Sequence, residues 1–225
     1  DGDAMTLPQA HLARVLALIR EHLPGIRRVS SYCLPRNLRS KTLEGLTELR
    51  QKGLGLVYVG CESGDDEVLR IVNKGETLES SVREVRKVKE AGIKASIMIL
   101  NGLGGPTLSR DHAVNSAKLV SMVQPDFLST LHVTFPLGME RFTSDFPDFR
   151  PLTEEESLLE MEAFLEAVEV DKCIFRSDHS SNLLALKGVL GKDKQRLIQH
   201  VRSARKGLLP VRALWEETRQ GQFGL

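Results

Sequence analysis

The feature of this sequence that most constrains its fold is a unit of one strand and one helix, repeated along the first two-thirds of the chain. Short apolar segments, each bounded by Gly or Pro, predict strands at residues 28–34, 55–61, 94–100 and 127–135. Amphipathic segments between them predict helices at residues 8–22, 42–52, 65–72, 78–91 and 109–123. Strands that alternate with helices are typical of βαβ units and of a parallel sheet.

Two architectures are compatible with right-handed βαβ connections, an open doubly wound sheet and a barrel. The sequence lacks the glycine fingerprint of a dinucleotide-binding fold, because the nearest segment, 101–105, does not have the G-x-G-x-x-G spacing. Polar residues recur instead where the predicted strands end: Tyr32, Glu62, Asn101 and His132. Barrels build their sites from such positions, so we expect an α/β fold with a partial parallel (β/α) barrel.

The N-terminal end of the chain departs from this repeat. Residues 1–3 lead directly into a helix, whereas every later unit begins with a strand, so we expect one or more strands of the barrel upstream of Asp1. Thr6 and Gln9 predict a capping box at the start of that first helix.

The repeat also ends near residue 138. We therefore divide the chain into an incomplete barrel core at 1–138 and a mainly helical extension with one short strand at 139–225. In the extension we expect a segment that crosses the surface at 138–151, a helix at 153–168 and a short strand at 172–176. Two further helices are expected at 183–190 and 193–206, and a tail or docking segment at 211–225.

Charge and cysteine usage narrow the possible partners. Lys and Arg number 31 against 30 Asp and Glu, so no overall field favours a nucleic-acid partner, and the apolar runs are too short to span a bilayer. The three cysteines, Cys33, Cys61 and Cys173, are widely separated, which indicates a reducing compartment and no disulfide framework. We therefore expect a cytoplasmic protein without a membrane partner, and no metal ligands in this chain.

Glu62 is the first candidate binding residue. Alternation along the second strand places Glu62 and Gly60 on the face opposite Val57 and Val59, at the mouth of a barrel. A carboxylate there can accept two hydrogen bonds from vicinal hydroxyls, such as those of a ribose. The alternative is a strand-end Glu that pairs with Lys74 or caps the next helix, and the pattern alone favours this alternative.

Three other segments have a functional and a structural interpretation. The glycine-dense loop 101–107 can offer backbone groups to a purine edge, or be a tight turn. Residues 1–3 can hold an ammonium group or a metal, or be a loop. Arg176, Asp178 and His179 can bind a polar substrate or relay a proton, or their segment can cap a helix.

The order of these motifs resembles the radical SAM superfamily. The motifs are DGD at 1–3, VYVGCESGDDEVL at 57–69, VNKG at 72–75 and ILNGLGG at 99–105. They are most similar to the branch of the coproporphyrinogen oxidases, the tRNA methylthiotransferases and the Elongator catalytic subunit. The specific part is G-x-E-S-G-x-D-x-x-L-x-x-x-N-K/R-G, and the resemblance covers residues 1–138. It implies a partial parallel (TIM-like) barrel of six βα units.

The resemblance also implies a site for S-adenosylmethionine (SAM). It assigns Gly2 and Asp3 to the methionyl ammonium, Glu62 to the ribose and Lys74 to the carboxylate. It assigns Asn101, Gly102, Leu103 and Gly104 to the adenine, with His132 on the next strand. Tyr32 stands where the family's third strand often has a carboxylate, so the sequence departs from the family there.

The largest departure concerns the [4Fe-4S] cluster. The family holds it through a C-x-x-x-C-x-x-C loop after the first strand, which this chain lacks, so we expect those ligands upstream of Asp1 and an inactive fragment. The resemblance implies reductive cleavage of SAM, hydrogen abstraction from an unknown, small-molecule substrate, and an electron donor such as flavodoxin or ferredoxin. The alternative is a SAM- or nucleotide-binding barrel that acts as a non-catalytic sensor or scaffold.

Overall fold

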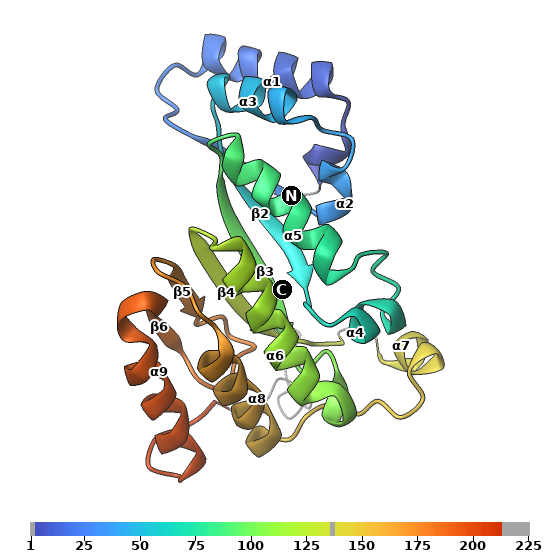
Figure 1. The fold of residues 1–225 in the computed structure, drawn as a ribbon, viewed down its shortest axis with the longest axis vertical. Coiled ribbons are helices and arrows are strands. Elements are labelled where there is room, and N and C mark those ends of the chain that lie inside the picture. The colour runs from blue at the N-terminus through green and yellow to red at the C-terminus, as the bar shows by residue number, and fades with distance from the viewer. Residues whose placement is uncertain (1–2, 136–137, 213–225) are drawn as a thin grey trace, which may run out of the picture.

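The computed structural model describes residues 3–135 and 138–212, which form one six-stranded sheet (Figure 1). Its strands, in spatial order, are β1 (Val29–Cys33), β2 (Leu54–Glu62), β3 (Lys94–Asn101), β4 (Phe127–His132), β5 (Ile174–Ser177) and β6 (Leu186–Val189). The first five strands are parallel, and β6 runs antiparallel to β5. Within the described residues β1 and β6 do not pair, so the sheet is an open part of a (β/α) barrel. This confirms the predicted fold class.

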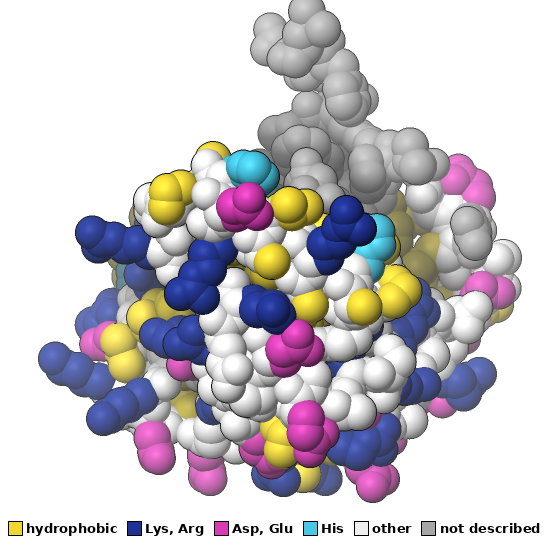
Figure 2. Space-filling view, turned by 90° about the horizontal axis from the view of Figure 1, so that it is seen from above, with side chains coloured by type: hydrophobic (Ala, Val, Ile, Leu, Met, Phe, Trp, Pro, Cys, Tyr) yellow, Lys and Arg dark blue, Asp and Glu magenta, His cyan; other side chains and the backbone are white. Residues whose placement is uncertain are grey.

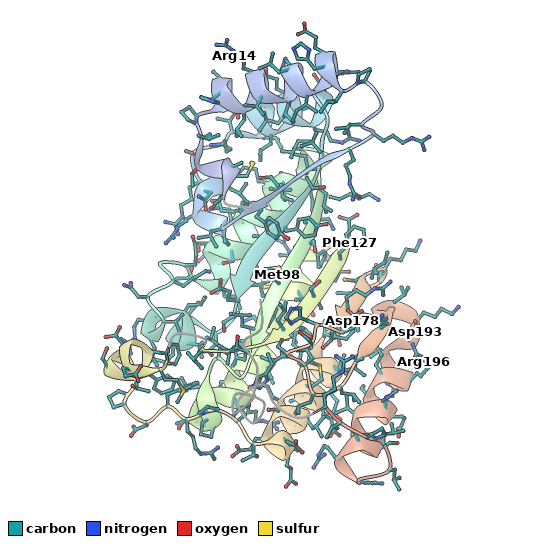
Figure 3. All side chains as sticks on the ribbon, turned by 180° about the vertical axis from the view of Figure 1, so that it is seen from behind. Arg14, Met98, Phe127, Asp178, Asp193 and Arg196 are labelled. Atoms are coloured by element: carbon teal, nitrogen blue, oxygen red, sulfur yellow. The ribbon has the colours of Figure 1, made fainter. Side chains whose placement is uncertain are left out.

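Helices cover one face of the sheet and leave the other bare (Figures 1 and 3). They are η1 (Ala4–Thr6), α1 (Gln9–His22), α2 (Pro35–Leu38), α3 (Leu43–Gln51), α4 (Asp66–Ile71), α5 (Leu78–Glu90), α6 (Gly105–Val123), α7 (Glu140–Asp145), α8 (Glu154–Ala167) and α9 (Leu190–Arg205). Alternate residues of each strand face the helices and form the core, where Val57, Ile97 and Leu128 are fully buried. Met98 and Phe127, labelled in Figure 3, lie on the bare face and are half-buried.

Side-chain caps explain where several helices begin. The Thr42 hydroxyl accepts a hydrogen bond from Gly45 N at the start of α3, and Thr153 forms a capping box with Glu156 at the start of α8. The predicted capping box of Thr6 and Gln9 is wrong. Thr6 lies in η1, and the Gln9 amide donates instead to the backbone oxygen of Gly45, 2.8 Å away.

The C-terminal part differs from the prediction in two places. The expected helix at 183–190 is wrong, because residues Leu186–Val189 form β6 and extend the sheet beside β5. The expected surface crossing at 138–151 contains α7 and a packed aromatic cluster, in which the Phe142 and Phe149 ring centroids are 4.5 Å apart. Burial of Phe146 and Phe149 gives this segment its own small core.

Most of the predicted tail, residues 213–225, lies outside the described part of the chain. Residues 139–212 add β5 and β6 to the same sheet as the core, so the sheet crosses the proposed division at residue 138. Among the residues that the structure describes, no helix has both the length and the apolar character needed to cross a bilayer.

The loop between β2 and α4 packs closely against α6. Asp65 caps α4 by accepting from Val68 N, and its other carboxylate oxygen accepts from the Asn115 side-chain amide at 2.7 Å. Gly64 N donates to the Ser116 hydroxyl at 2.9 Å. A Cβ at Gly64 would lie 2.2 Å from the backbone oxygen of Asn115, so this close approach requires glycine.

We expect Gly64→Ala to lower the free energy of unfolding by on the order of 3 kcal/mol, because the new methyl group must displace the backbone of α6. Urea denaturation followed by circular dichroism measures the change. Gly25→Ala is the matched control, since an added Cβ there meets no atom within 4 Å. An equal free energy of unfolding for both variants would contradict the packing described here.

Candidate functional site

Three of the predicted site residues end neighbouring parallel strands. Glu62 ends β2, Asn101 ends β3 and His132 ends β4. In the ladder Glu62 is opposite Ile99, and Asn101 is opposite His132. The carboxyl ends of parallel strands meet at one edge, so these residues share one side of the sheet, which we call the rim.

Glu62 reaches the rim through an irregular backbone. The register of β2 and β3 shifts between Gly60 and Glu62, and Glu62 has a φ of 67°, in the left-handed region. Its carboxylate Oε1 pairs with the Lys74 ammonium group, and 27% of the Glu62 side chain is exposed against 11% for Lys74. The residues assigned to the ribose and to the SAM carboxylate therefore pair with each other, as the structural interpretation expected.

The glycine loop is anchored by a residue from α8. Gly102, with a φ of 80°, donates its N–H to Glu160 Oε1 at 2.6 Å, and Ser109 donates its hydroxyl to Glu160 Oε2 at 2.6 Å. Glu160 is buried, and the sequence analysis did not identify it. Its place on the apolar face of α8, beside Leu158 and Met161, is the signal that could have found it.

His132 packs directly on this loop. A Cβ at Gly102 would lie 3.1 Å from His132 Cε1, so the imidazole covers the glycine backbone. Burial lowers the pKa of His132 to about 4, and the ring is therefore neutral near pH 7. Leu103 and Gly104 are buried in the same loop.

A small cavity with polar and apolar lining residues lies beside His132 at the ends of β3, β4 and β5. It measures about 20 Å³ and is lined in part by Asn101, His132 and Ser177. Of its other lining residues, Ser157 and Asn182 are buried. The hydroxyls of Ser157 and Ser177 and the Asn182 Oδ1 atom have no hydrogen-bond partner among the described residues. A cavity of this size suits one ordered water that would satisfy these atoms.

Asp3 and Tyr32 lie near β1, and Gly2 lies outside the described residues. The Asp3 Oδ1 atom is buried without a hydrogen-bond partner in the described part of the chain. Burial raises the pKa of the Cys33 thiol, and the nearby Asp3 carboxylate adds to the shift, so Asp3 lies close to the end of β1. The Tyr32 ring stacks on Tyr58 with centroids 5.1 Å apart, and 49% of Tyr32 is exposed.

The three candidate substrate residues each have a separate local partner. Arg176 is exposed and donates to the backbone oxygen of Phe175. Asp178 pairs with Lys187 at 2.7 Å, which holds the pKa of that carboxyl below its usual range. His179 Nδ1 lies 2.8 Å from the Ser181 hydroxyl. The segment caps no helix, because β6 follows it.

The described cysteines do not offer a thiolate site. Burial raises the pKa of Cys61 to about 12 and that of Cys173 to about 12, so both thiols stay protonated near pH 7. No group of three His, Cys, Asp or Glu side chains that could hold a metal ion occurs within residues 3–135 and 138–212.

A buried hydrogen-bond chain behind the rim is the second feature that the sequence analysis missed. The Ser63 hydroxyl lies 2.8 Å from His112 Nδ1, and His112 Nε2 lies 3.0 Å from the backbone oxygen of Leu100. Because a carbonyl oxygen only accepts, Nε2 carries a proton and donates it to the Leu100 oxygen. The Ser63 oxygen also accepts from Asp65 N at 2.9 Å. The chain thus links the ends of β2 and β3.

An open parallel sheet with polar groups at the carboxyl ends of its strands defines a (β/α)-barrel protein with a site at one rim. The family model described as the Radical SAM superfamily matches residues 1–120, more than half of the chain. The chain therefore belongs to the radical SAM superfamily.

Two curated proteins are similar over part of their length. A tRNA uridine(34) acetyltransferase from Methanocaldococcus infernus is 21% identical over 118 residues, which are 50% of this chain and 22% of that protein. An uncharacterized protein from Methanopyrus kandleri is 30% identical over 104 residues, 42% of this chain and 17% of that protein. The chain thus spans less than a quarter of either relative.

Two solved structures share the fold. The archaeal Elp3 of Methanocaldococcus infernus aligns with a TM-score of 0.62 and 15% identity, covering 93% of this chain and 54% of that one. The coproporphyrinogen III oxidase of Escherichia coli aligns with a TM-score of 0.59 and 23% identity, covering 73% and 38%. These similarities show a shared fold, and the open sheet matches part of each larger fold.

The neutral state of His132 predicts a pH dependence of stability. Its folded pKa of about 4 lies below the ordinary value of 6.5, so between these pH values only the unfolded chain binds the proton. The free energy of unfolding should fall as the pH falls through this window, by up to about 1.4 kcal/mol per pH unit. Urea denaturation at a series of pH values gives the slope of the free energy of unfolding against pH. The difference between the slopes of wild type and His132→Gln is the contribution of His132.

His11→Gln, on the exposed surface of α1, is the control and should keep the wild-type slope. If His132→Gln also kept the wild-type slope between these pH values, the buried neutral state of His132 would be ruled out.

Proposed function

We propose that the protein to which this chain belongs is a radical SAM enzyme whose cluster ligands lie upstream of Asp1. The observation that carries the proposal is that Glu62, Asn101 and His132 end three adjacent parallel strands at one rim. When bound, SAM and a [4Fe-4S] cluster would supply reductive cleavage and hydrogen abstraction from a substrate. The chain itself would bind and orient SAM.

The polar end of SAM would meet three charged residues. The buried, unpartnered Oδ1 of Asp3 is a suitable acceptor for the methionyl ammonium group. Lys74 would bind the SAM carboxylate, and Glu62 would accept from the ribose hydroxyls. The ion pair of Glu62 and Lys74 involves Oε1, so the second oxygen of Glu62 is available to a ribose.

The adenine would lie beside the glycine loop, against the His132 ring that covers the Gly102 backbone. The loop is fixed because Glu160 holds Gly102 N–H, and Gly104 belongs to the same loop. Leu103 and Asn101 belong to the same turn. His132 is partly buried, and this burial keeps it neutral, so it would pack beside the ring without adding a charge. These residues would orient the adenosyl group and exclude water from it.

The cluster requires residues beyond those described. The buried, protonated thiols do not fit a cluster, so its three cysteines are proposed to precede Asp1. Delivery of an electron to that cluster would require a donor such as flavodoxin or ferredoxin. The reducing cytoplasm would keep this donor reduced. Arg176, Asp178 and His179 of the extension are the proposed substrate residues, and the substrate is proposed to be a small molecule.

The test uses the full reading frame, reconstituted without oxygen with iron and sulfide. Glu62→Gln should weaken SAM binding by on the order of 1–3 kcal/mol, the cost of losing a charged hydrogen-bond acceptor. Titration calorimetry measures the affinity. Glu67→Gln is the matched control, because Glu67 is exposed on α4 and pairs with Arg70. Equal SAM affinities for wild type and Glu62→Gln would remove Glu62 from the site.

The same preparation separates the enzyme from the sensor or scaffold. Addition of dithionite to the SAM complex should release 5′-deoxyadenosine, measured by chromatography. Tight SAM binding with no 5′-deoxyadenosine, in a reading frame without an upstream cysteine triplet, would favour the scaffold and end the proposal of catalysis.

A further inference from the structure

A second cavity lies at the opposite end of the sheet from the rim. It measures about 310 Å³ and lies between the C-terminal ends of α1 and α3 and the start of β1. Its charged lining residues are all cationic, namely Arg20, Arg27, Arg28, Arg50 and Lys52. Leu16, Ile19, Leu23 and Ile26 supply an apolar wall. We call this cavity the basic pocket.

The charge of the basic pocket is local. The whole chain has 31 Lys and Arg against 30 Asp and Glu, yet no acidic residue lines this cavity. Figure 2 views the molecule from the α1 end. Lys and Arg side chains gather on its left, the side on which Figure 1 shows the loop between α1 and β1. Cavity walls that carry one sign of charge focus the field on a ligand of opposite sign.

Helix ends account for only part of this charge. Arg20 donates to the backbone oxygen of Gln51 at 3.3 Å, and Arg50 donates to that of Gly92 at 2.9 Å. Such cations neutralise free carbonyl groups where helices end. Lys52 has Glu48 at 3.8 Å. Arg27 and Arg28, by contrast, form no hydrogen bond or ion pair with any described residue.

Arg28 is held in place by a glycine of the neighbouring strand. A Cβ at Gly55 would lie 2.7 Å from Arg28 Cγ, so the arginine stem crosses directly over the β2 backbone. Gly55 lies at the start of β2, one residue after Leu54, which pairs with Val29. The stem is therefore packed while the guanidinium group stays exposed, and less side-chain entropy is lost when an anion binds.

We propose that the basic pocket binds a small molecule that carries a di- or triphosphate group. Guanidinium groups match phosphate oxygens with paired hydrogen bonds, and Arg27 and Arg28 have their donors free. The apolar wall suits the organic body of such a ligand, and the volume is that of a small ligand site. A single-stranded nucleic acid fits less well, because no aromatic side chain lines the cavity for a base to stack on.

The test titrates the 225-residue chain with tripolyphosphate and with ADP in about 150 mM KCl, where diffuse charge is screened. We expect saturable binding of both by calorimetry, with one ligand per chain. Arg27→Gln/Arg28→Gln should weaken it roughly tenfold or more, because two charged donors are lost. Glutamine keeps the Cβ and Cγ atoms that pack over Gly55, and Arg27→Gln alone should weaken binding in the same direction.

The matched control is Arg14→Gln/Lys118→Gln, which removes two cations from exposed positions on α1 and α6 outside the basic pocket. It should bind both probes with wild-type affinity. The proposal fails if the unaltered chain shows no saturable binding, or if the control loses as much affinity as the pocket variant. It also fails if a short single-stranded RNA with a 5′-hydroxyl end displaces ADP and binds more tightly. SAM takes no part in these titrations, so their outcome is independent of the proposed enzyme activity.

Discussion

The hydrogen-bond chain from Ser63 through His112 to the Leu100 carbonyl is the interaction on which the geometry of the rim depends. The Ser63 and His112 side chains are buried, and buried polar atoms are tolerated only when each has a partner. Here each has one, so the segment after β2 is joined through α6 to the end of β3. Glu62 directly precedes Ser63, and Asn101 directly follows Leu100. This hydrogen-bond chain therefore fixes Glu62 and Asn101 at the rim relative to each other.

This arrangement gives a physical reason for the motif at residues 60–75. Glu62 is the residue of its E-S-G-x-D part that lies at the rim, whereas Ser63, Gly64 and Asp65 hold the loop against α6. A left-handed backbone at a non-glycine residue costs about 1–3 kcal/mol, and Glu62 adopts one. The buried contacts of the following residues offset that cost, so Ser63 and Gly64 of the motif, together with Asp65 at its variable position, help to position one carboxylate.

The parts of the fold that follow from local patterns could be predicted from the sequence. β1 to β4 lie close to their predicted ranges because alternation of β-branched residues and bounding glycines are local signals. β6 could not be predicted as a strand, because a short segment becomes one only by pairing with β5. The roles of Glu160 and His112 could not be predicted for a related reason. Their partners Gly102 and Ser63 lie 58 and 49 positions away in the sequence. Strand ends alone indicated where a site could lie, and long-range contacts decide which atoms are free in it.

The two ends of the sheet differ electrostatically, and the difference follows from βα topology. In a βα unit the helices that cover a parallel sheet run back toward its amino-terminal edge, so α3 and α5 present their carbonyl ends there, where Arg20 and Arg50 donate to the backbone oxygens of Gln51 and Gly92. At the rim, by contrast, Glu62 and Lys74 neutralise each other and His132 is neutral. Helix ends explain Arg20 and Arg50 but not Arg27 and Arg28, which follow α1 in the loop before β1. Both of these arginines line the basic pocket without a partner among the described residues, and an anion bound there would neutralise their charge. An anion bound between this loop and the end of α3 would stabilise the folded state, because it would bind the folded chain and not the unfolded one.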